Sequence, residues 1–242
     1  MVLNMHRRRA FLTLAIGSIV AFPELFSRAL RKLRSQPRSK ESADRGTPID
    51  WDAFLEELER IANGHENYLS YQRADASLID RLAGTLNLQQ IRARGFPLLN
   101  RSRIEHPDLT LLLRKERFEV AMLSFQPGDH IPAHDHPTMA AVSACILGGV
   151  KIWNYDSVNC EANAGTRLLR PVKDVVLGAG QTSLLTAAHG NIHDLTAVVE
   201  SQIVDILTPS YNPDRARRSR SYFVDPASKP DNRGLLTAVV CC

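Results

Sequence analysis

The stretch that decides the fold is Gly128-Asp129-His130-Ile131-Pro132-Ala133-His134-Asp135-His136-Pro137-Thr138-Met139, followed by an apolar run that ends at Gly148-Gly149. His134 and His136 are two residues apart, and side chains at that spacing point to the same face of a β-strand. Pro137 cannot continue a central ladder, so the pair is predicted to lie at a strand end or a bulge. Two imidazoles that converge in this way predict half of a metal site.

Beyond residue 108 the chain consists of short apolar or alternating segments, many of them separated by Gly, Pro, Asn or Asp. Short segments with turn residues between them are typical of β-strands, and no helical period interrupts them. The sequence therefore predicts an all-β fold, an antiparallel sandwich or barrel. The expected strands are 109–113, 118–124, 141–146, 150–152, 167–169, 174–176, 182–184, 196–198 and 202–206.

The residues before this region follow a different period. Apolar residues recur at helical spacing from Trp51 to Ile61, with Asp50 or Thr47 as the cap and Gly64 as the end. A second helix is predicted around residues 77–86. The expected division of the chain is a leader 1–34, a linker 35–48, a helical segment 49–100, a β-domain 101–223 and a C-terminal surface tail 224–242.

Residues 1–34 have the pattern of a targeting segment. Arg8-Arg9, followed by Phe11-Leu12 and a short apolar stretch to Phe22, is typical of a bacterial export signal of the twin-arginine type. The apolar stretch is shorter than a membrane span requires. We expect export to the bacterial periplasm, or anchoring at the inner membrane through this leader alone. The alternatives are a mitochondrial presequence, a helix on a membrane surface and a cytoplasmic protein.

The formal net charge of +4 arises in the first 40 residues, which include the leader. Residues 1–40 hold nine Lys and Arg and one acid, a charge of +8, which leaves −4 for the remainder. A body with this balance lacks the basic surface that nucleic-acid binding needs, so we expect no nucleic-acid partner. The four cysteines show no Cys-x-x-Cys spacing, which disfavours a zinc knuckle or a thioredoxin-like site. We expect a monomer.

The spacing Gly128-x5-His134-x-His136 resembles the first signature of the cupin superfamily, and Gly190 with His193 resembles the second. The resemblance implies a single cupin double-stranded β-helix barrel with an N-terminal helical extension. It also implies a metal site of His134, His136 and His193.

The glutamate that usually follows the first signature is absent, because Ala140 and Ala141 stand in its place. The site would then consist of three neutral imidazoles, and such a site suits Fe(II) with open coordination positions.

Three separated segments resemble the family of plant cysteine oxidases and cysteamine dioxygenases. They are His134-Asp135-His136-Pro137, Gly190-Asn191-Ile192-His193 and Asp205-Ile206-Leu207-Thr208-Pro209-Ser210-Tyr211, in which Ser210 replaces a proline of the family. The resemblance implies an Fe(2+)-dependent thiol dioxygenase, in which both atoms of O2 pass to sulfur to give a sulfinic acid. The implied substrate is a small aminothiol or a Cys-initiated peptide.

By the same resemblance, Asp205 and Tyr211 are the candidate catalytic residues. Asp205 would hold the ammonium group of the substrate or orient oxygen, and Tyr211 would donate a hydrogen bond near the iron. The alternatives are a salt-bridged or capped strand residue for Asp205 and a core residue for Tyr211. Asp135 is expected to point away from the ligands. Asp194 and His189 are candidates for contacts behind them, and His130 is expected in a loop.

Two other classes of function remain open at this point. The same three histidines would serve a cupin oxygenase that acts on a carbon substrate. They would also serve a non-catalytic cupin that binds a metal or a ligand, since the fold alone does not decide the function.

Overall fold

The computed structural model describes residues 47–64, 73–93, 107–158, 165–211, 218–225 and 227–241. The predicted leader 1–34 lies outside the described residues, as does all but the end of the predicted linker. Within the part of the chain that is described, no helix is long and apolar enough to cross a membrane.

Three helices precede the strands: α2 (Trp51–Asn63), α3 (Arg73–Gly84) and α4 (Leu88–Ala93). The Asp50 side chain caps α2 by accepting a hydrogen bond from the Ala53 amide at 2.9 Å, and Gly64 closes the helix. The first predicted helix is therefore confirmed. The second begins earlier than predicted and ends at Gly84, so this glycine closes the helix and does not interrupt it.

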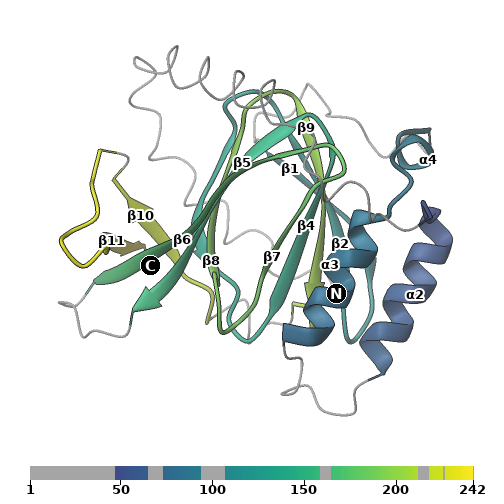
Figure 1. Ribbon diagram of the computed structural model, residues 1–242, viewed down its shortest axis with the longest axis horizontal. Coiled ribbons are helices and arrows are strands. Elements are labelled where there is room, and N and C mark those ends of the chain that lie inside the picture. The colour runs from purple at the N-terminus through teal and green to yellow at the C-terminus, as the bar shows by residue number, and fades with distance from the viewer. Residues whose placement is uncertain are drawn as a thin grey trace, which may run out of the picture. The chain divides into compact units, whose positions relative to one another are not determined.

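The strands form two sheets that enclose a barrel (Figure 1). The first sheet has the order β1-β2-β9-β4-β7, and the second closes on itself in the order β10-β11-β6-β5-β8-β3. All the strand pairings are antiparallel, and the predicted all-β fold with an N-terminal helical extension is confirmed. The strands are β1 (Asp108–Arg114), β2 (Glu119–Phe125), β3 (His130–Asp135), β4 (Ala140–Leu147), β5 (Gly149–Val158), β6 (Thr166–Gly178), β7 (Thr182–Leu185), β8 (Ile192–Ala197), β9 (Ser201–Thr208), β10 (Ser221–Val224) and β11 (Leu236–Cys241).

Strand β9 shows how the sheet divides its two faces. Val204 and Ile206 pack with side chains of α2 and α3. These two helices cover this sheet (Figure 1). Ile203 points inward and packs against the second sheet, with Leu195 and Ile152. Burial of each of these side chains contributes about 1.5–3 kcal/mol, so alternation along the strand stabilises both layers at once.

The predicted C-terminal tail needs correction. Residues 224–242 include β11, which pairs with both β10 and β6 and closes the second sheet. Leu236 and Ala238 alternate inward and pack on Leu169 and Tyr222 in a small separate core. The predicted strands 167–169 and 174–176 are also one strand, β6, because a bulge in its pairing with β5 accommodates Pro171.

Candidate metal centre

Three imidazoles meet at one point in the structure. The Nε2 atom of His193 lies 3.0 Å from Nε2 of His136 and 3.1 Å from Nε2 of His134. His136 and His193 are each 3% exposed, and His134 is half-buried. Among the described residues this is the one group of His, Cys, Asp or Glu side chains arranged to hold a metal ion.

The strand register brings these side chains together. His134 on β3 is paired directly with His193 on β8, so their side chains share one face. A bulge between Ile131 and His134 shifts the register just before the first ligand. Strand β3 ends at Asp135, and His136 follows in the turn that contains Pro137. The predicted strand end and bulge are therefore both present.

The Nδ1 atoms of two ligands are held from behind. His134 Nδ1 donates to the Pro132 carbonyl at 2.9 Å, inside the same bulge. His136 Nδ1 lies 3.1 Å from the Tyr211 hydroxyl. A neutral imidazole that donates from Nδ1 presents the lone pair of Nε2, so these contacts select the tautomer that a metal ion needs.

The backbone of His136 is clamped by the loop before β8. The Asn191 side chain accepts from the His136 amide at 3.1 Å and donates to the His136 carbonyl at 3.0 Å. It also donates to the Thr186 carbonyl at 3.2 Å. The Asn191 side chain therefore joins the turn that carries His136 to the loop that leads to His193.

The geometry and the charge of the group both fit a divalent metal ion. The two nitrogen pairs about 3 Å apart, His193 with His136 and His193 with His134, would each subtend nearly a right angle at an ion about 2.1 Å from both nitrogens. Burial and the nearby His134 and His136 hold the pKa of His193 well below its usual value, so this ring is neutral and free to coordinate. The alanines at the usual glutamate position, Ala140 and Ala141, are both buried.

Asp205 is buried on the first sheet, on the inward side of β9 with Ile203 and Leu207. Its Oδ1 accepts a hydrogen bond from the Ser143 hydroxyl at 2.7 Å. Burial raises its pKa to about 6, with a smaller contribution from the nearby Glu119 carboxylate, and the Ser143 hydrogen bond opposes this rise. Among the described residues, Asp205 forms no ion pair. It thus differs from the salt-bridged strand residue that was one alternative role for it.

Tyr211 follows β9 and contacts the metal group from behind His136. With Nε2 directed at a metal ion, the Nδ1 proton of His136 is donated to the Tyr211 oxygen. The hydroxyl oxygen then accepts from a ligand, and its own O–H remains a donor for the role beside the iron that the sequence suggested. The buried Glu119 carboxylate fixes this segment, because it accepts from the Tyr211 amide at 3.3 Å and from Arg114 Nε at 2.9 Å.

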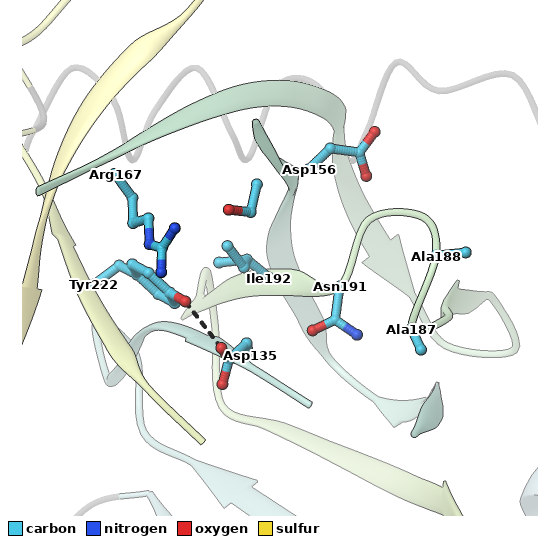
Figure 2. A pocket seen from close by; sticks show the side chains of 9 residues that line it. Asp135, Asp156, Arg167, Ala187, Ala188, Asn191, Ile192 and Tyr222 are labelled. Carbon is cyan, nitrogen blue, oxygen red and sulfur yellow. Dashed lines mark hydrogen bonds between the residues drawn. The ribbon is translucent and has the colours of Figure 1, made fainter. Parts of the chain in front are cut away.

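Asp135 points away from the metal group, as strand alternation predicts. Its carboxylate accepts from the Tyr222 hydroxyl at 2.9 Å and from the Arg220 amide at 2.6 Å. It lines a separate pocket of about 380 Å³ with Arg167 and Asp156, shown in Figure 2, and none of the three ligands lines that pocket. Asp135 therefore ties β10 to the strand that carries His134.

Among the described residues, the remaining titratable candidates make side-chain contacts away from the ligands. Asp194 pairs with His130 at 2.6 Å, and His130 lies in β3, not in the loop where it was expected. His189 lies 3.4 Å from the Asp156 carboxylate. The sequence did not predict three residues that support the site: Pro132, Glu119 and Asn191, whose side chain clamps His136. Only Asn191 had a signal in the sequence, through its place in the second histidine segment.

The PCO_ADO family matches residues 98–236 of the chain. The chain belongs to the PCO_ADO family. The match runs past residue 223, the predicted end of the β-domain, and so includes the strand β10 and the start of β11.

Curated relatives agree with this assignment. Plant cysteine oxidase 2 of Arabidopsis thaliana is 31% identical over 50% of this chain and 46% of its own length. The human 2-aminoethanethiol dioxygenase is 27% identical over 47% of this chain and 50% of its own. The chain thus spans about half the length of the curated relatives that it matches.

Solved structures match about half of this chain at low scores. An RmlC-like cupin protein from Desulfovibrio desulfuricans is 15% identical, covers 48% of this chain and 96% of its own, and has a TM-score of 0.35. KdgF from Halomonas sp. covers 48% and 94%, at 13% identity and the same TM-score. The fold of this PCO_ADO member is an antiparallel barrel with an N-terminal helical extension, as predicted.

Proposed function

We propose that this protein is an Fe(II)-dependent thiol dioxygenase. The reaction joins a thiol and one O2 to give a sulfinic acid, so that both oxygen atoms pass to sulfur and no external reductant is consumed. The observation that carries the proposal is the group of three imidazoles with buried alanines where a carboxylate ligand would stand. The names of the curated relatives support the same chemistry.

Iron bound to His134, His136 and His193 would supply a cationic centre with open positions for a thiolate and for O2. The residues of this chain do the rest. Pro132 and Tyr211 hold two of the rings in one tautomer, and Asn191 keeps the segment of His136 in place. A ligand set without a carboxylate leaves the full positive charge of the ion, which favours an anionic substrate.

Asp205 is the candidate that would select a substrate with an amino group. Its carboxyl is buried and has a pKa of about 6, so an incoming ammonium group would shift it to the carboxylate form and gain a buried ion pair. We therefore propose a small aminothiol or a Cys-initiated peptide as the substrate. A thiol of the same length without an amino group would lose this contact.

Oxygen uptake tests the activity. The protein is loaded with Fe(II) without air, and uptake and product mass are then recorded with cysteamine, cysteine and a Cys-initiated peptide. We expect one O2 consumed per thiol and a mass gain of two oxygens, with no uptake by His193→Ala. Retained iron without uptake on any thiol would favour a different cupin chemistry or a binding role.

We also propose that the leader directs this chain to export. The support is the pattern of Arg8-Arg9 before an apolar stretch. Because twin-arginine export moves folded proteins, iron could be loaded in the reducing cytoplasm first. In a bacterial host the double variant Arg8→Lys, Arg9→Lys is expected to remain in the cytoplasm, and an unchanged location would contradict the proposal.

A further inference from the structure

A buried amide on β5 has one hydrogen-bonding atom that no described residue satisfies. Asn154 is 2% exposed, and its Nδ2 donates to the Gly190 carbonyl at 3.3 Å. Because a carbonyl can only accept, this contact assigns the nitrogen end of the amide, and Oδ1 is the other end. In the described part of the chain, Asn154 Oδ1 has no hydrogen-bond donor. Such an acceptor is costly in a protein interior, so a partner is expected there.

Asn154 is the strand neighbour of a metal ligand. It is paired directly with His193 between β5 and β8, and directly paired residues send their side chains to the same face. The next inward pair, Ile152 and Leu195, lies in the core between the two sheets. Asn154 and His193 therefore share the interior face of the second sheet. Their β-carbons are expected to be about 5 Å apart, within reach of a side-chain hydrogen bond.

The pairing between β5 and β8 is regular at this residue. It runs without a register shift from Val150 to Tyr155, so Asn154 is held directly beside His193. The shift between β5 and β6 at this level leaves the extra residue, Val172, on β6 and not on β5.

His193 differs from the other two ligands in the contacts of its Nδ1 atom. His134 Nδ1 donates to a carbonyl, and His136 Nδ1 is hydrogen bonded to a hydroxyl. Among the described residues, every hydrogen-bond contact of the His193 ring is made through Nε2. A histidine that binds a metal ion almost always donates its other N–H to an acceptor. The third ligand thus needs an acceptor, and the adjacent amide has one to offer.

We propose that Asn154 Oδ1 accepts the Nδ1–H hydrogen bond of His193 when the metal is bound. Asn154 is then a positioning residue of the metal centre: it fixes the tautomer of the third ligand and directs the Nε2 lone pair to the ion. Its Nδ2 holds Gly190, three residues before that ligand, so one amide orients both the loop and the ring. The inference rests on the proposed metal site.

Two substitutions at the position separate the acceptor from the donor. Asn154→Leu keeps the volume and removes both groups, whereas Asn154→Asp keeps the acceptor and loses the donor to Gly190. The measured quantity is the dissociation constant of Fe(II), and of Co(II) as a second probe, from anaerobic competition with a chelator. Thr196→Val, on the outer side of the same strand as His193, is the matched control.

We expect Asn154→Leu to weaken metal binding by about 10–100-fold. Asn154→Asp and Thr196→Val are expected to bind as tightly as the wild type or more tightly. Equal losses in the Leu and Asp variants would overturn the proposal, because they would assign the effect to the contact with Gly190. Wild-type affinity in the Leu variant would overturn it as well.

A second measurement needs no variant. In the wild type loaded with Zn(II), heteronuclear NMR of the imidazoles is expected to show a His193 Nδ1 proton that exchanges slowly with solvent. Rapid exchange of that proton would contradict the proposal. A wild type that binds no metal at the three histidines would overturn the proposed function itself, which distinguishes that failure from a failure at Asn154 alone.

Discussion

Replacing Asp205 by Asn is expected to change how the stability of the metal-free protein depends on pH. The carboxyl is buried inside the barrel and accepts a hydrogen bond from Ser143, and Asn retains an oxygen for that bond. Burial raises its pKa from an ordinary value of 3.8 to about 6, so the folded chain holds this proton more tightly than the unfolded chain does. Unfolding between these pH values releases a proton, and a rise in pH therefore favours unfolding.

The size of the effect follows from the same pKa values. Each pKa unit corresponds to about 1.4 kcal/mol, so ionisation of Asp205 lowers the free energy of unfolding by about 3 kcal/mol once the pH is well above 6. The Asn variant has no such cost. Relative to the wild type, Asp205→Asn should gain about 3 kcal/mol of stability between pH 3.5 and pH 8, with most of the change falling between about pH 4 and pH 6.

Urea unfolding of both metal-free proteins across a pH series measures this difference. The control is Glu200→Gln, which removes an exposed carboxyl just before β9. A stability difference between wild type and Asp205→Asn that is the same at every pH would refute the reasoning. So would a gain that appears as the pH falls.

Three further predictions concern the metal centre and the strands that hold it. Tyr211→Phe removes the acceptor from His136 and should weaken Fe(II) binding by about 10–100-fold, as chelator competition would show. His136→Ala should abolish binding at one ion per chain, measured by metal analysis after desalting, while the far-ultraviolet circular dichroism stays that of the wild type. Gly148→Ala should lower the free energy of unfolding in urea by more than about 3 kcal/mol, because Gly148 has φ +75° and the new β-carbon would collide with the backbone of Glu200. The control is Gly128→Ala, where φ is +88° and the space around the new β-carbon is open. It should lower the free energy of unfolding by only about 1–2 kcal/mol.

Much of the metal group could be predicted, because it depends on local spacing. His134 and His136 are two residues apart, and the bulge and strand end leave both directed at one point. The position of His193 needed the register of a distant strand, which only the family resemblance could supply. The contacts behind the ligands were out of reach, since the Tyr211 contact with His136 depends on how the chain turns after β9.

The strands were predicted well where the apolar alternation is long. Strand β11 was missed because its alternation is short and follows a polar stretch with Pro230 and Gly234, which read as a surface tail. Strand β6 was divided at Pro171 because proline cannot donate to a ladder, and only the three-dimensional pairing shows that a bulge accommodates it there. Asn154 had no signal at all, since its importance depends on the register with His193.

The central claim is that both oxygen atoms of one O2 pass to a thiol at the three-histidine centre. Mass spectrometry of the product formed under isotopically heavy dioxygen, with Fe(II)-loaded protein and an aminothiol, tests it most directly. We predict a sulfinic acid that carries two heavy oxygen atoms, and no such product from His193→Ala. A product with one heavy atom or none, or the same labelled product from His193→Ala, would contradict the account.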